Sequence, residues 1–136
     1  MSDDTTPEED RGGIVRPAAD VNAEPLKGAR STRIQVLVGP DDGAPNFVMR
    51  RILMDEEGSG MPAHTNIVEH EQYVLRGRAR VGIGAEKYEV GAHDTVFIPA
   101  GTPHWYDVLE APFEFLCIVP NVTDEVRLVD EEADKS

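Results

Sequence analysis

Three histidines, His64, His70 and His104, are the residues of this sequence best suited to chemistry. A neutral imidazole is a good ligand for first-row transition metals such as iron, nickel, copper and zinc. His64 and His70 lie in a stretch that alternates as a β-strand does, and His104 follows the turn sequence PAGTP at 99–103. The sequence therefore predicts a metal site, provided that strands bring the three imidazoles to one inner wall of a β-barrel.

The alternation of side chains along residues 70–76 decides which of them face the site. Successive side chains of a β-strand point to opposite faces, so His70 and Gln72 share one face and Glu71 takes the other. Glu71 competes with His70 as a ligand if the register is shifted by one residue. We prefer His70, because Glu71 would face away from the other candidates. Gln72 is then expected to line the substrate pocket.

The remaining candidates reach the same wall from two other segments. His64 and Asn66 share a face, and a short turn over residues 67–69 would let both meet His70. Tyr106, two residues beyond His104, lies on the same face as that histidine. We expect Tyr106 to provide a hydroxyl group in the pocket.

Short apolar runs separated by Gly- and Pro-containing turns predict strands and no long helix. No run of ten residues keeps apolar positions at helical spacing without a Gly or Pro. The sequence predicts an all-β fold, a two-sheet antiparallel jelly-roll barrel (double-stranded β-helix) of about residues 30–120, with at most one helical turn. The expected strands are 33–38, 46–54, 70–76, 79–83, 87–90, 94–99, 104–108 and 113–119.

Composition divides the chain into one barrel with two acidic ends. Residues 1–24 contain too few apolar side chains to offset the entropy of ordering, so we expect a largely disordered arm, in which the part near Ile14 and Val15 could dock on the body. The barrel is expected over residues 25–122. Residues 123–136 are expected to form an acidic tail that frays from about Asp124.

Charge and the lack of long apolar runs exclude several classes of partner. The 26 acidic and 13 basic residues give a net charge of -13, so nucleic acid would be repelled. We expect no membrane partner and a cytoplasmic location, because no apolar run follows Met1 and none approaches membrane-spanning length. Cys117 is the single cysteine, and its apolar neighbours predict a buried, inert thiol.

Two motifs resemble those of the cupins, a superfamily of small jelly-roll barrels. The first family motif, G-x5-H-x-H-x3,4-E-x6-G, is matched in spacing by Gly58-x5-His64-x-Asn66-x3-His70-x6-Gly77. The second, G-x5-P-x-G-x2-H-x3-N, is matched by His93-x5-Pro99-x-Gly101-x2-His104-x3-Val108. In the first motif, Asn66 replaces the second His and His70 replaces the Glu. His and Val replace the outer Gly and Asn of the second.

The resemblance implies a metal set of His64, Asn66, His70 and His104 in each subunit. It implies one divalent transition-metal ion, either Fe, Mn, Ni, Cu or Zn. Three neutral imidazoles would leave the full metal charge, which favours anionic ligands. Asn66 either binds weakly through its amide oxygen or leaves an open coordination position. His93, in place of a turn glycine, is expected to have positive φ rather than a metal role.

Two classes of function are consistent with this resemblance. One is a metal-dependent enzyme acting on a small molecule, most concretely a mononuclear oxidoreductase resembling the quercetin-dioxygenase-like cupins. No catalytic base can be assigned from the sequence. The alternative is a non-enzymatic cupin that binds a small anion or sugar, with the metal structural or absent.

Exposed strand edges in residues 33–38 and 46–54 further predict a homodimer.

Overall fold

The computed structural model describes residues 12–129, whose ordered elements are almost all β-strands. Two 3₁₀ turns, η2 (Ala18–Asp20) and η3 (Pro40–Asp42), are the only helical elements in this range, one more than expected. Proline at the start of η3 and Gly43 at its end, with φ of 89°, favour that turn. The strands are β1 (Glu24–Pro25), β2 (Thr32–Val38), β3 (Phe47–Met54), β4 (Gly60–Asn66), β5 (His70–Ile83), β6 (Glu86–Gly91), β7 (Thr95–Ile98), β8 (His104–Pro120) and β9 (Val126–Leu128).

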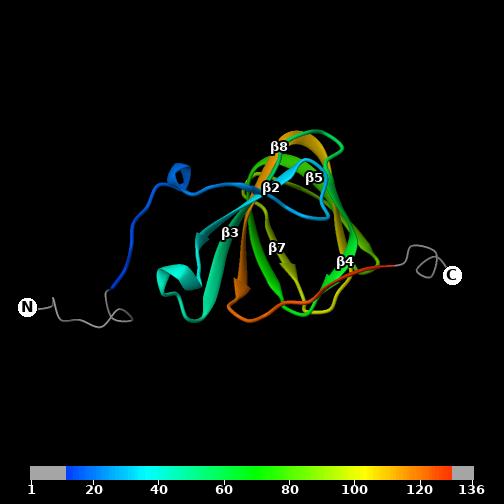
Figure 1. The fold of residues 1–136 in the computed structure, drawn as a ribbon. Helices are drawn as coiled ribbons and strands as arrows, with labels where there is room; N and C mark the ends of the chain where they lie inside the picture. Colours follow the sequence, from blue (N-terminus) through cyan, green and yellow to red (C-terminus); the bar gives the residue numbers. More distant parts are fainter. Residues whose placement is uncertain (1–11, 130–136) are drawn as a thin grey trace, which may run out of the picture.

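All strand pairings are antiparallel, and the strands curl into a barrel (Figure 1). One series runs β1-β2-β3-β8-β4-β9, and β5 pairs with β6, β7 and β8. The predicted all-β jelly-roll barrel is confirmed. The strands nevertheless form one continuous nine-stranded sheet rather than two, because β8 pairs with β4 near its start and with β3 near its end.

Two pairs of expected strands are each a single long strand. Residues 70–83 form β5 and residues 104–120 form β8. Gly77, which falls between the two expected strands 70–76 and 79–83, lies inside β5 with φ of 82°, where the pairing with β8 shifts register. A Cβ atom at Gly77 would lie 2.2 Å from the carbonyl oxygen of Pro112. This glycine therefore permits a bulge that bends the strand without ending it.

The core lies inside the barrel and is built from alternate residues of the central strands. Ile52 on β3 is opposite Phe115 on β8, which is also opposite Val74 on β5. All three side chains are almost fully buried. Ile52 and Phe115 of this apolar row also line the cavity described below.

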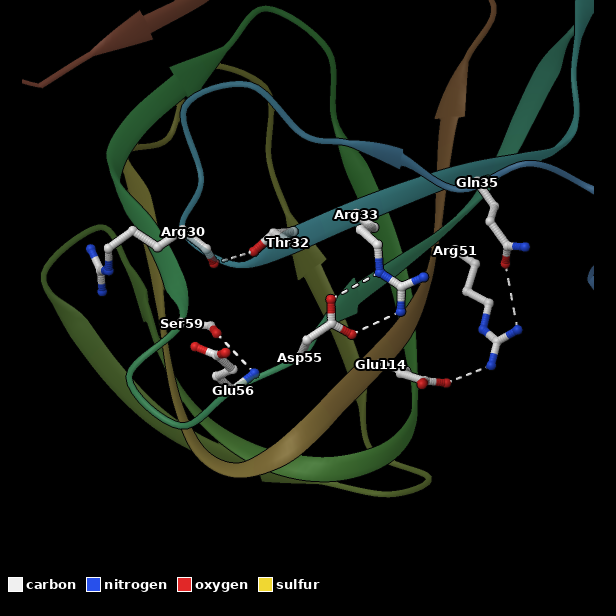
Figure 2. Close-up of polar contacts among 9 residues, drawn as sticks. All are labelled: Arg30, Thr32, Arg33, Gln35, Arg51, Asp55, Glu56, Ser59 and Glu114. Carbon is white, nitrogen blue, oxygen red and sulfur yellow. Dashed lines mark hydrogen bonds and ion pairs between the residues drawn. The ribbon is translucent and has the colours of Figure 1, made fainter.

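Ion pairs on the outer face fasten β2, β3 and β8 together (Figure 2). Arg33 pairs with Asp55 through two hydrogen bonds of 2.8 and 2.9 Å. Arg51 pairs with Glu114 at 2.5 Å and lies 3.5 Å from the side-chain oxygen of Gln35. These contacts fix the register of the strands and so the positions of the inward side chains.

Both ends of the described chain contact the body. Arg16 donates to Asp42 and to the carbonyl oxygen of Leu37, whereas Val15 is fully exposed. Residues 1–11, part of the expected disordered arm, and 130–136, part of the expected tail, lie outside the described residues. Within the tail that was expected to fray from Asp124, residues 126–128 form β9, which pairs with β4. Within residues 12–129, no helix has the length and hydrophobicity of a membrane span.

Candidate metal centre

A cavity of about 170 Å³ opens inside the barrel. All six residues expected to form the metal site and substrate pocket line it: His64, Asn66, His70, Gln72, His104 and Tyr106. The 67–69 link separates β4 from β5, as expected. These two strands are not paired with each other, however, so the link joins different parts of the curled sheet.

The three histidines lie close to one another in this cavity. His64 on β4 is opposite His104 on β8, and their ring centroids are 4.2 Å apart. The ring centroids of His70 and His104 are 5.5 Å apart. Two imidazoles bound to one ion through nitrogens at about 2.1 Å place their centroids roughly 4.5–5 Å apart. The His64–His104 separation is shorter than this range, and the His70–His104 separation is longer.

Backbone carbonyls orient two of the imidazoles. Nδ1 of His64 lies 2.9 Å from the carbonyl oxygen of Pro62, and Nδ1 of His104 lies 2.9 Å from that of Thr102. A carbonyl can only accept, so each Nδ1 carries the proton and each Nε2 keeps its lone pair. His70 differs, because its Nδ1 is buried without a hydrogen-bond partner.

Burial keeps the two innermost histidines neutral. His70 and His104 are only 6% and 2% exposed. Burial lowers the pKa of each to about 4, and for His70 the positive charge of Arg50 lowers the pKa further. Neutral imidazole is the form that binds a metal ion, so both rings hold their ligand form across the physiological pH range.

Asn66 is held in place by Asp124, a residue that the sequence analysis did not select. The Asn66 side-chain nitrogen donates to Asp124 at 2.6 Å, which leaves the buried amide oxygen Oδ1 without a partner. A carboxylate can only accept, so this contact fixes the amide orientation. Asp124 also accepts from the backbone N–H of Ile67 at 2.9 Å. The unpartnered oxygen is the ligand atom that Asn66 would offer to a metal.

The donor set fits a first-row metal, although the side chains do not yet enclose one point. Within residues 12–129, no group of three or more His, Cys, Asp or Glu side chains has the geometry of a formed metal site. The three imidazoles and the unpartnered oxygen of Asn66 nevertheless border one cavity.

The register expected for residues 70–76 is confirmed. His70 and Gln72 are buried, whereas Glu71 is exposed. Gln72 donates to the Tyr106 hydroxyl at 2.7 Å, so the two expected pocket residues contact each other. His93 has φ of 76°, as its turn position predicted, and it lies 2.9 Å from the Tyr73 hydroxyl.

Arg50 is a second cavity residue that the sequence analysis missed. It lies on β3 with the same parity as Ile52 and Met54, both of which are buried in the core. The alternation of side chains along this strand could therefore have identified Arg50 as an inward-facing residue. Asp124 had no such signal, because nothing local predicts that it returns to the barrel to meet Asn66.

A cupin-domain family model (Cupin_2) matches residues 51–119, which contain the histidines, Gln72, Tyr106 and the strands that carry them. The chain belongs to the cupin family. Among solved structures, this cupin is similar to the polyketide cyclase RemF from Streptomyces resistomycificus. The sequences are 30% identical, the TM-score is 0.80, and the match covers 88% of this chain and 87% of that one.

Two further proteins are similar to this chain. A cupin 2 domain-containing protein from Halorhodospira halophila is 30% identical, with a TM-score of 0.68 and coverage of 80% of this chain and 75% of that one. An uncharacterized protein of Methanocaldococcus jannaschii is 36% identical over 62 residues, which are 44% of this cupin. The match spans 50% of that relative's length.

Proposed function

We propose that this cupin is a metal-dependent enzyme acting on a small molecule, with one divalent transition-metal ion, either Fe, Mn, Ni, Cu or Zn. His64, His70 and His104 would hold the ion, and Asn66 would add its amide oxygen. The observation that carries this proposal is the meeting of three histidines and an unpartnered amide oxygen at one cavity. The reaction class that we favour is a mononuclear oxidoreductase of the dioxygenase type.

An ion bound there supplies Lewis acidity and, if its oxidation state can change, redox chemistry with O₂. The protein would contribute the shape of the cavity around it. Burial raises the pKa of Tyr106, which keeps the hydroxyl protonated. Gln72 donates to the Tyr106 oxygen, so the hydroxyl hydrogen remains free to bond an oxygen atom of the substrate. Phe115 stacks on the Tyr106 ring at 5.3 Å and holds it in place.

A second candidate is a cyclase-type reaction that needs no redox change. It is favoured by the likeness to the polyketide cyclase RemF, which is 30% identical over 88% of this chain. In this reaction the neutral Tyr106 would stabilise a developing enolate oxygen by donating a hydrogen bond. Oxygen consumption distinguishes the candidates, because only the oxidoreductase uses O₂.

The test begins with elemental analysis of protein purified without a histidine tag, followed by titration of chelated protein with Mn(II), Fe(II), Ni(II), Cu(II) and Zn(II). We expect one ion per chain, and we expect His64→Ala, His70→Ala and His104→Ala each to abolish stoichiometric binding. His93→Asn is the control, because it removes an exposed imidazole that does not line the cavity. Glu71→Ala should bind metal as wild type does, since Glu71 faces away.

Oxygen uptake after Fe(II) loading, measured over a panel of small-molecule substrates, then tests the reaction class. Consumption of O₂ that is lost in His104→Ala supports the oxidoreductase. Conversion of a β-polyketone without O₂ uptake favours the cyclase. A protein that takes up none of the five metals would refute the metal-dependent enzyme and favour the non-enzymatic binding role.

A further inference from the structure

Arg50 places a positive charge on the inner face of the barrel, beside the cavity. It shares strand parity with the core residues Ile52 and Met54 on β3. Its register partner on β8 is Cys117, which is also opposite Gln72 on β5. Residues opposite each other in a sheet share a face, so Arg50, Cys117 and Gln72 form one polar row. All three line the cavity.

The Arg50 guanidinium has no acidic partner among residues 12–129. Its Nη2 donates to the Cys117 sulfur at 3.0 Å, and its Nε is buried without an acceptor. Arg51, the next residue, faces the opposite way and pairs with Glu114 at 2.5 Å, although its Nε also lacks an acceptor. Arg50 is only partly exposed, and a guanidinium group whose Nε is shielded from water without an acceptor favours a negatively charged ligand.

The other charged groups of the cavity leave this positive charge uncompensated. Lys27 adds a second cation to the lining. Asp124 is the one carboxylate among the lining residues in the described chain. Its oxygens already accept from the Asn66 side chain and from the backbone of Ile67 and Glu125. The cavity is thus locally cationic within a protein whose net charge is -13.

We propose that the ligand of this cavity is a small carboxylate whose carboxyl group binds Arg50. The Nε–H and a neighbouring Nη–H of an arginine form a planar fork that matches the two oxygens of a carboxylate. A volume of about 170 Å³ admits a ligand that displaces roughly six waters. The role of the carboxylate as substrate rests on the proposed function, whereas its binding at Arg50 requires no metal.

The test compares matched acids and amides on chelated protein by isothermal titration calorimetry. The probes are acetate, pyruvate and benzoate, each paired with its uncharged amide, together with inorganic phosphate. We expect at least one acid to bind at least tenfold more tightly than its amide. Binding of none of the acids below about 10 mM, equal binding of acid and amide, or tighter binding of phosphate than of any acid would overturn the proposal.

Substitution of Arg50 tests the residue itself. Arg50→Met should weaken binding of the best acid at least tenfold while leaving the thermal midpoint without ligand unchanged or raised, because an unpaired charge is replaced by an apolar side chain of similar length. Arg50→Lys keeps the charge but loses the fork, and should give an intermediate affinity. Arg80→Met, the same change at an exposed position of β5, is the control and should bind the acid normally. Wild-type affinity in both Arg50 variants would overturn the assignment.

The two proposals fail in different ways. Metal titration of the same wild-type samples shows whether the histidines bind an ion. If acids bind at Arg50 but no metal does, the metal function is wrong and the carboxylate site stands. If metal binds stoichiometrically but no acid binds, the carboxylate site is wrong and the metal function stands.

Discussion

Lowering the pH should destabilise the metal-free protein through two buried histidines, His70 and His104. The pKa of each is about 4 in the folded protein and about 6.5 in an unfolded chain. Between these values the unfolded state binds more protons than the folded state. The free energy of unfolding is therefore highest above about pH 6.5 and falls as the pH is lowered toward about 4.

The size of this loss follows from the two pKa values. At pH 5.0 each histidine lowers the free energy of unfolding by about 2 kcal/mol relative to pH 7.5. Two such groups give about 4 kcal/mol, which corresponds to a fall in melting temperature of roughly 10–15 °C for a domain of this size. Both side chains are almost fully buried, so solvent screening reduces the figure little.

Urea unfolding of chelated protein at several values between pH 7.5 and 5.0 measures the loss directly. The reference is the double variant His70→Gln/His104→Gln, which lacks both titrating groups but keeps the remaining acids and histidines. We expect the wild type to lose about 4 kcal/mol more than this variant over the same range. Each single variant should show about half of that difference. Equal losses in the wild type and the double variant, within about 1 kcal/mol, would refute the reasoning.

Four further variants test the site, the bend and the assembly. Asp124→Ala should weaken metal binding about tenfold in a calorimetric titration, because the Asn66 amide loses its hydrogen bond to Asp124. Asn66→His should tighten metal binding by adding a fourth imidazole. Gly77→Ala should cost at least about 2 kcal/mol in urea unfolding, because φ of 82° and the Pro112 carbonyl both oppose a Cβ atom. In a light-scattering measurement of molecular mass, we expect the wild type to be a homodimer and Phe47→Lys to give the monomer mass of 14.9 kDa. The reason is that Phe47 is 65% exposed on β3. A wild-type monomer would contradict this prediction.

The sequence by itself determined the fold class and most of the inward-facing residues. Side chains alternate along every strand, so His70 and Gln72 had to share a face whatever the strand paired with. His93 could be assigned positive φ because it occupies a turn position. The first inference depends on the local geometry of a strand and the second on the glycine position that His93 takes in the second cupin motif, and both held in the structure.

The tertiary structure decided which residues meet across the barrel. Asn66 contacts Asp124, and Arg50 contacts Cys117, across 58 and 67 positions of sequence. Such pairs depend on the register between distant strands, which alternation within one strand does not specify. The bulge at Gly77 also depends on pairing between distant strands. A glycine between two expected strands becomes a bulge within one strand because β5 pairs with β8 on both sides of it. The sequence therefore located the histidines, whereas the fold added the aspartate that orients Asn66 and the arginine without an acidic partner.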